Sequence, residues 1–111
     1  PRRMNDREVY WTPTALQDLA SILAHVAAEN PDAAVAAILR LETRAESLRT
    51  LTPRGRTVPE LREIGVHQYR ELIERPWRLI YTVETERVAL VAVLDARRDL
   101  ATLLLERLIR S

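Results

Sequence analysis

The chain has 111 residues, of which 47% are hydrophobic, so its length and composition fit one globular domain with a core of its own. It contains no cysteine, which excludes a disulfide framework, a thiol nucleophile and cysteine-ligated zinc. The formal net charge is only +1, and all 17 basic residues are arginines, so any cationic site here must use guanidinium groups that do not titrate near neutral pH.

The hydropathy pattern gives no sign of a membrane span, which needs roughly 20 consecutive apolar residues. The longest apolar run, Val88–Leu94, has the length of a strand, and no apolar stretch follows the basic N-terminus as a secretory signal would require. We therefore expect a cytoplasmic protein with a single domain over residues 1–111, in which residues 1–7 form a flexible N-terminus.

The chain opens with a predicted strand, Glu8–Trp11, followed by a helix that Thr12 caps and Pro13 begins. Asp18 lies early in this helix, where we expect the helix dipole to favour an acid. The helix should end near Asn30. Apolar residues at helical spacing predict its buried face, which consists of Leu16, Leu19, Leu23 and Val26.

A second helix is predicted to start at Asn30, because Asn30, Pro31 and Asp32 repeat the pattern of cap, proline and acid. The two helices should form an antiparallel hairpin, and their apolar stripes should be buried against a flat surface of the protein. The predicted stripe of the second helix contains Val35, Ile38, Leu41, Ala45 and Leu48.

The segment Thr52–Pro59 interrupts the helical pattern with two prolines and Gly55, one of only two glycines. Such a composition predicts an irregular, exposed loop over Pro53–Pro59. We expect this loop to exchange backbone hydrogens early and to be cut first by proteases.

Three strands are predicted next, at His67–Glu74, Arg78–Glu84 and Arg87–Leu94. The turns between them are short, which makes neighbouring strands antiparallel. The last strand is apolar on both faces, which predicts an interior position covered on both sides.

A final helix is predicted over Arg98–Arg110, with Asp95 or Asp99 as its cap. The element order is therefore β-α-α-β-β-β with a C-terminal helix. It predicts an α+β fold in which an N-terminal helical hairpin packs on a small, mainly antiparallel sheet.

Three segments resemble the RelE/ParE toxin superfamily, and the ParE branch in particular. "VYWTPTALQDLASI" resembles the opening of ParE proteins, "PRGRTVPELREIGVHQYRELIERPWRLIYTV" their centre, and "VAVLDARRDL" the end of their last strand. The resemblance runs from about Val9 to Leu100. It implies the toxin of a bacterial toxin–antitoxin pair, with a cognate antitoxin that binds through an acidic, partly helical segment. Asp95 stands where many members carry histidine, so a role of that histidine is lost here.

The RelE branch cuts messenger RNA on the ribosome with basic side chains and a C-terminal tyrosine. Matched by motif, Arg70, Arg78 and Arg97 fall on positions of phosphate-holding cations, whereas Leu72 and Leu103 replace the second lysine and the tyrosine. An arginine does not readily act as a base, which leaves two phenols, Tyr69 and Tyr81, as candidates for proton transfer.

Each of these residues also has a structural interpretation that the sequence leaves open. Arg70 and Arg78 are placed to form ordinary cross-strand ion pairs. Their nearby partners would be Glu71, Glu74 and Glu84. Trp77 and Tyr81 are suited to the core.

ParE toxins instead inhibit DNA gyrase, which requires a docking surface and no catalytic residue in the toxin. Between residues 96 and 111 there are four arginines and only two acids, which suits a partner that carries DNA. The corresponding target-binding residues are Arg97, Arg98, Arg107 and Arg110; the alternative is a solvated helix face.

We therefore predict a gyrase inhibitor, because the tyrosine and the second lysine are absent. The alternatives are a ribosome-dependent mRNA endonuclease and a family member that only binds an antitoxin. No cofactor or metal is expected, since His25 and His67 lack metal-ligand spacing and Gly55 and Gly65 do not form a phosphate-binding loop.

Overall fold

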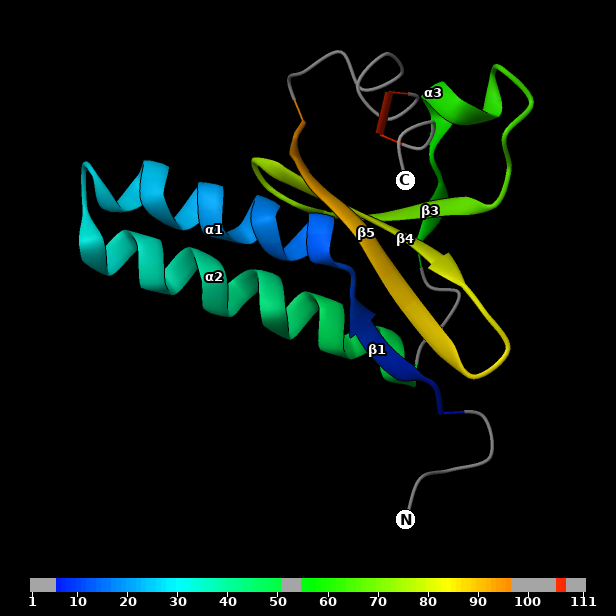
Figure 1. Ribbon diagram of the computed structural model, residues 1–111, viewed down its shortest axis with the longest axis horizontal. Helices are drawn as coiled ribbons and strands as arrows, with labels where there is room; N and C mark the ends of the chain where they lie inside the picture. The colour runs from blue at the N-terminus through cyan, green and yellow to red at the C-terminus, as the bar shows by residue number, and fades with distance from the viewer. Residues whose placement is uncertain (1–5, 51–54, 97–105, 108–111) are drawn as a thin grey trace.

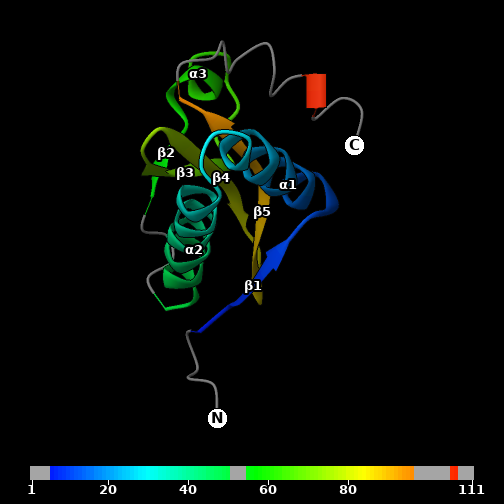
Figure 2. The ribbon, with the colours of Figure 1, turned by 90° about the vertical axis from the view of Figure 1, so that its left-hand side faces the viewer.

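The computed structural model describes residues 6–50, 55–96 and 106–107, and shows the predicted α+β architecture (Figure 1). Two N-terminal helices lie side by side against one face of a five-stranded sheet (Figure 2). The strand order is β1-β5-β4-β3-β2; β1 runs parallel to β5, and every other neighbouring pair is antiparallel.

The first strand and helix follow the prediction closely. Strand β1 is Glu8–Trp11 and helix α1 is Pro13–Ala27. The Thr12 hydroxyl accepts a hydrogen bond from the Ala15 N–H and donates one to the Leu90 carbonyl, so the helix cap is also joined to the sheet. Asp18 lies beyond the first helical turn, so its predicted interaction with the helix dipole is wrong.

Helix α2 is Pro31–Glu46, capped by Asn30 as predicted, and it continues into a short 3-10 helix, η1, at Ser47–Arg49. The buried faces of the hairpin were only partly predicted. Small alanines let the helices approach the sheet closely, so several larger residues of the predicted stripes point outward instead. Buried are Ala15, Leu19, Ala34, Ala37, Leu41 and Ala45, while the exposed large residues are Leu16, Leu23, Val35 and Leu39.

The central strands shift slightly from the predicted bounds. Strand β3 is Tyr69–Glu74, β4 is Trp77–Val83 and β5 is Arg87–Asp95. Strand β5 lies between β1 and β4 and is buried on both faces, which confirms the prediction for the last strand. His67 precedes β3 and is exposed.

The loop predicted over Pro53–Pro59 is wrong in its second half. Arg56–Thr57 forms strand β2, which pairs with β3, and Pro59–Arg62 forms a short helix, α3. Gly55 is buried against β3 rather than exposed. Pro59 begins α3, so this proline marks an element boundary and not an irregular loop. Residues 51–54 lie outside the described part of the chain.

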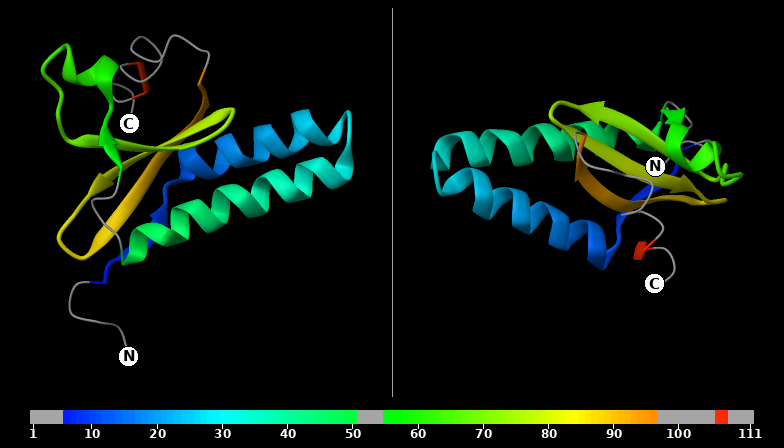
Figure 3. Two further views of the ribbon diagram at one scale, coloured as in Figure 1. Left: turned by 180° about the vertical axis from the view of Figure 1, so that it is seen from behind. Right: turned by 90° about the horizontal axis from the view of Figure 1, so that it is seen from above.

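The sheet separates two apolar clusters. The hairpin side holds Tyr81, Leu79, Leu90 and Val93 with residues of α1 and α2, and the opposite side holds Ile80, Ala92 and Leu94 beneath α3. Figure 3 shows the hairpin on one side of the sheet and α3 displaced from it.

A β-bulge interrupts the pairing of β4 with β5. Ile80 faces Ala92 and Tyr81 faces Leu90, which leaves Val91 as an additional residue in β5. Strand residues alternate in the direction of their backbone groups, so a single extra residue changes the phase of this alternation. The bulge therefore fixes which N–H groups of β5 point away from β4, toward the β1 side, after Leu90.

Before β1, Arg7 donates two hydrogen bonds. Its backbone N–H donates to the Arg49 carbonyl and its Nε donates to the Glu84 carbonyl. The predicted C-terminal helix lies mostly outside the described residues, although Glu106 and Arg107 are helical. Within the described part of the chain, no helix has the length and apolarity to cross a membrane.

Candidate functional site

The sheet separates the residues considered for RNA cleavage. Arg70 of β3 faces Tyr81 of β4, while Arg78 of β4 faces Ile73 of β3. Cross-strand partners share a face, and residues three apart in one strand point to opposite faces. Arg70 and Tyr81 therefore lie on the hairpin side, and Arg78 lies on the α3 side.

Arg78 is at the centre of a buried ion-pair cluster. Its Nε donates to Glu71 Oε1 at 2.6 Å, and its Nη1 and Nη2 donate to the two Glu60 carboxylate oxygens at 2.7 and 2.8 Å. The Arg78 side chain is 7% exposed and that of Glu71 is fully buried. Arg56 donates to the other Glu71 oxygen at 2.5 Å, and we call these four residues the Arg78 cluster.

The cluster changes the ionisation of its members. Hydrogen bonding from Arg78 is the main cause that lowers the pKa of Glu60, and it outweighs the partial burial of the carboxyl group. Burial acts to lower the pKa of Arg78, but the hydrogen bonds that Arg78 donates to Glu60 and Glu71 outweigh burial and raise the pKa. The Glu60 and Arg78 side chains therefore favour their charged forms, and the Arg78 guanidinium is engaged by protein carboxylates.

The hairpin-side pair, Arg70 and Tyr81, is also engaged within the fold. Arg70 Nη1 donates to the Gly55 carbonyl at 2.8 Å, and the Gly55 N–H donates to the Tyr81 hydroxyl at 2.7 Å. Tyr81 is fully buried in the hairpin-side core, where Trp77 also lies, which confirms their interpretation as core aromatics. A Cβ on residue 55 would overlap the Glu71 carbonyl, so this close approach requires glycine.

Apart from Arg107, the other residues considered for RNA cleavage or target binding lie in the two apolar clusters or outside the described part of the chain. Leu72 is buried in the hairpin-side core, and Tyr69 packs against the α3-side cluster. Arg97, Arg98, Leu103 and Arg110 lie outside the described residues. Arg78 forms the expected ion pair with Glu71. Glu74 also forms ion pairs, but with Arg40 and Arg44 of α2 instead of Arg70 or Arg78.

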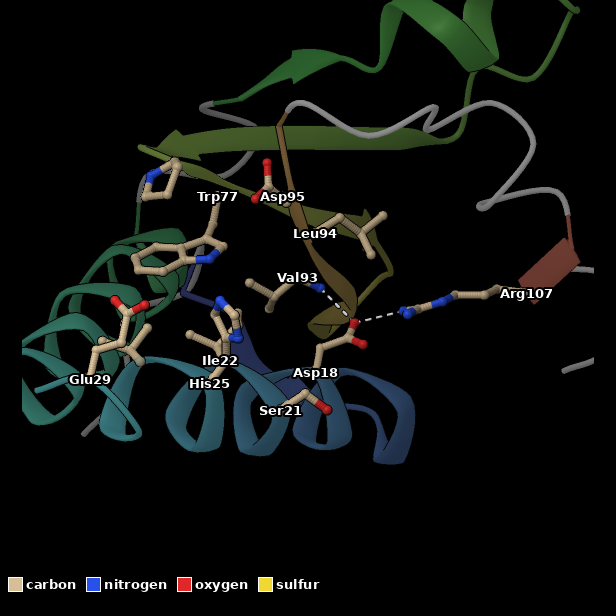
Figure 4. Close-up of a pocket in the computed structure, with 12 residues that line it drawn as sticks. Asp18, Ser21, Ile22, His25, Glu29, Trp77, Val93, Leu94, Asp95 and Arg107 are labelled. Carbon is tan, nitrogen blue, oxygen red and sulfur yellow. Dashed lines mark hydrogen bonds and ion pairs between the residues drawn. The ribbon is translucent and has the colours of Figure 1, made fainter. Parts of the chain in front are cut away.

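Arg107, the one described member of the cationic C-terminal set, forms a second polar site at the hairpin side. Its Nη1 contacts Asp18 Oδ2 at 2.7 Å, and the same oxygen accepts the Val93 N–H at 2.8 Å (Figure 4). We call these three residues the Asp18 junction. The junction borders an open pocket of about 590 Å³ between α1 and the ends of β4 and β5, lined also by His25, Glu29, Trp77 and Asp95.

The described residues do not form a metal site, because no three histidine or acidic side chains among them are grouped to hold an ion. His25 is exposed on α1 and lines the pocket. Among the described residues, the polar groups of the Arg78 cluster and of the Asp18 junction are engaged mainly with one another.

Comparison with known proteins identifies the family. The sequence profile described as "ParE toxin of type II toxin-antitoxin system, parDE" matches residues 9–100. The chain belongs to the ParE toxin family. This ParE-family chain is similar in structure to a chain of the chromosomal ParDE system from P. aeruginosa, with a TM-score of 0.68 and 22% identity over 82% of this chain and 97% of that chain.

A second structural relative of this ParE-family toxin comes from the toxin–antitoxin complex RelBE2 of Mycobacterium tuberculosis. The TM-score is 0.56 at 19% identity, over 86% of this chain and 97% of that chain. At such identities the likeness shows the shared fold alone. None of the curated protein sequences compared with this chain matches it.

Two carboxylates make contacts between elements that the sequence did not predict. No role was expected for Glu60, and Asp18 was expected to interact with the helix dipole. The signal for Glu60 is its place after Pro59, at the first turn of α3. The signal for Asp18 is its position one residue before the buried Leu19, which directs its side chain toward the sheet edge.

Proposed function

We propose that this ParE-family toxin inhibits DNA gyrase through a binding surface, and that a cognate antitoxin neutralises it. The observation that carries the proposal is the division of Arg70, Arg78 and Tyr81 between the two faces of the sheet. RNA cleavage needs phosphate-holding cations and a proton-transfer group around one scissile bond. Arg70 and Tyr81 are separated from Arg78 by the sheet. Tyr69 shares the α3 side with Arg78, but the Arg78 guanidinium is engaged by two carboxylates there.

The engagement of the same side chains adds to this argument. Arg78 is surrounded by Glu60 and Glu71, and an RNA phosphate would have to replace both carboxylates in a buried position. The Tyr81 hydroxyl is enclosed and accepts the Gly55 N–H. These contacts favour a structural role for Arg78 and Tyr81, and they support binding over catalysis as the proposed activity.

The hairpin supports the proposal of an antitoxin partner. Four large apolar side chains on α1 and α2 are between 42% and 58% exposed, which is a common property of surfaces that a partner protein covers. They are Leu16, Leu23, Val35 and Leu39. The P. aeruginosa relative is part of a ParDE system. We expect an acidic, partly helical antitoxin segment that folds on this surface.

The mechanism is tested by two assays on one preparation of purified toxin. Gyrase inhibition predicts loss of plasmid supercoiling or accumulation of cleaved DNA without ribosomes. A ribosome-dependent endonuclease predicts fragments of a defined message in a purified translation system instead. Message cleavage with supercoiling unaffected at micromolar toxin would overturn the proposal, and inactivity in both assays would favour a family member that only binds an antitoxin.

The antitoxin proposal is tested with a matched pair of exposed apolar residues. Leu39 of α2 and Ile64 beyond α3 are 58% and 51% exposed, respectively. Leu39→Glu is expected to weaken antitoxin binding at least about tenfold, because a charge must then be buried in the interface. Ile64→Glu is expected to leave binding unchanged. Equal effects of the two variants would exclude the hairpin surface as the antitoxin site.

A further inference from the structure

We infer that Asp18 is a positioning residue that anchors the C-terminal segment at Arg107 to α1 and to the end of β5. The inference rests on the proposed function, in which the cationic C-terminal region meets the target. It separates the four arginines of that region into one anchor, Arg107, and three residues left for target contact.

The first part of the argument is the shared oxygen. Asp18 Oδ2 accepts from Arg107 Nη1 at 2.7 Å and from the Val93 N–H at 2.8 Å. The Asp18 side chain is only 11% exposed and that of Arg107 is 28% exposed. A charge-assisted hydrogen bond in such a partly buried place is stronger than a surface ion pair. One carboxylate therefore joins three segments that are far apart in sequence.

The second part is the reason why β5 needs this carboxylate. Strand β1 ends at Trp11, opposite Leu90, and the Thr12 N–H makes the next bond to the Leu90 carbonyl. Beyond that point β5 extends past its parallel neighbour. Because the bulge at Val91 changes the alternation, the Val93 N–H points toward α1 on the side that β1 has left. A buried N–H without an acceptor is costly, and Asp18 supplies the acceptor.

The third part concerns what remains for a target. The Arg107 guanidinium already contacts a carboxylate of its own chain through Nη1, so part of its charge is compensated before any target binds. The contact fixes Arg107 itself against α1 and the end of β5. Loss of Asp18 and loss of Arg107 should then have the same consequence, since each removes one half of the same anchor.

The anchor is tested without any target by amide hydrogen exchange in the purified full chain. Asp18→Asn keeps an oxygen for the Val93 N–H but removes the charge that holds Arg107. We expect the amides of residues 106 and 107 to exchange about tenfold faster in Asp18→Asn and in Arg107→Gln than in the unmodified chain. The double variant should exchange no faster than either single variant. Val93 should exchange faster only in Asp18→Ala, and Arg107→Lys should retain most of the protection.

Matched controls are Glu42→Gln and Arg62→Gln, which remove the same charges from exposed positions on α2 and α3. They should leave exchange at Glu106 and Arg107 unchanged. The inference is overturned if Asp18→Asn behaves like Glu42→Gln, or if the effects of Asp18→Asn and Arg107→Gln simply add.

Gyrase inhibition then gives a second readout that a purely structural role would not produce. We expect Asp18→Asn and Arg107→Gln to raise the inhibitory concentration by the same factor, with no further increase in the double variant and recovery in Arg107→Lys. Arg107→Gln lowering inhibition in an Asp18→Asn background would show direct target contact and overturn the inference. If the unmodified chain fails to inhibit gyrase, the proposed function fails, while the exchange experiment still decides the anchor.

Discussion

The Arg78 cluster and the Asp18 junction both use an arginine and a carboxylate to join the sheet to another part of the chain, yet they differ in burial and in partner number. Arg78 is 7% exposed and has two carboxylates, one of them fully buried, whereas Arg107 is 28% exposed and shares a single carboxylate. Arg78 and Arg107 are equally plausible as functional residues in the sequence. Their burial and their carboxylate partners in the fold are what distinguish them.

The largest expected effect comes from Arg78→Ala. Removing the guanidinium leaves the buried Glu71 charge with the exposed Arg56 as its one remaining ionic partner among the described residues. Breaking a buried pair in this way costs about 3–5 kcal/mol, which urea unfolding of the purified protein measures directly. The double variant Arg78→Met with Glu71→Leu should recover more than half of the loss, because it removes both charges. A loss below about 1 kcal/mol for Arg78→Ala would place Arg78 in solvent contact.

Gly55→Ala is expected to have the next largest effect. The new methyl group would overlap the Glu71 carbonyl and lie 2.6 Å from the Tyr81 hydroxyl oxygen. Because a backbone carbonyl in a paired strand moves little, we expect a loss of about 3 kcal/mol in the free energy of unfolding. Gly65→Ala provides a control in open space, although its φ of +85° makes that position strained as well. A Gly55→Ala variant no less stable than Gly65→Ala would contradict the close packing of β2 on β3.

Asp18→Ala should destabilise the fold less than either of these changes. The Val93 N–H loses its acceptor in a partly buried place, for which we expect about 1–2 kcal/mol by urea unfolding. If Asp18→Ala lowered the free energy of unfolding more than Arg78→Ala does, the comparison would be reversed. The Asp18 junction would then stabilise the fold more than the Arg78 cluster.

The smallest effect is a pH dependence that belongs to the Arg78 cluster. The pKa of Glu60 is lowered in the fold, chiefly by its hydrogen bonds from Arg78, so its contribution to stability is present above the ordinary pKa of a glutamate and is lost as the pH falls through the lowered value. Glu60 is 35% exposed, and solvent screening keeps this contribution below about 1 kcal/mol. Glu60→Gln should flatten the acid side of the stability curve, and Glu63→Gln should not. If stability depended on pH in the same way in Glu60→Gln and Glu63→Gln, Glu60 would not take part in the Arg78 cluster.

The sequence predicted the elements that have strong local signals. Thr12-Pro13 and Asn30-Pro31 are cap and first-turn pairs, and both helices begin at those residues. The short turns and the apolar run of the last strand likewise predicted the antiparallel strands β3, β4 and β5. These features depend on neighbours in the chain, so a single sequence contains enough information to predict them.

What the sequence did not predict depends on contacts between distant segments. Strand β2 has two residues and exists because β3 offers a free edge for it, with Arg56 against Glu71. The buried face of α1 uses Ala15 rather than Leu16, since the distance between helix and sheet decides which side chain fits. Asp18 acquires its role only where β5 extends past β1. Neither composition nor spacing reports such distances.

The parallel pairing of β1 with β5 has a consequence for the order in which the protein is made. The Thr12 hydroxyl bonds the Leu90 carbonyl across 78 residues of sequence, while α1 with α2 and β3 with β4 are local pairs. Contacts of large sequence separation form slowly and late, because a long loop must first close. A chain emerging from the ribosome is therefore able to form the hairpin early, but β1 has no strand to join until Leu90 is outside. The segment up to Leu90 must leave the ribosome before the toxin fold closes, so an antitoxin made at the same time first meets an incomplete partner.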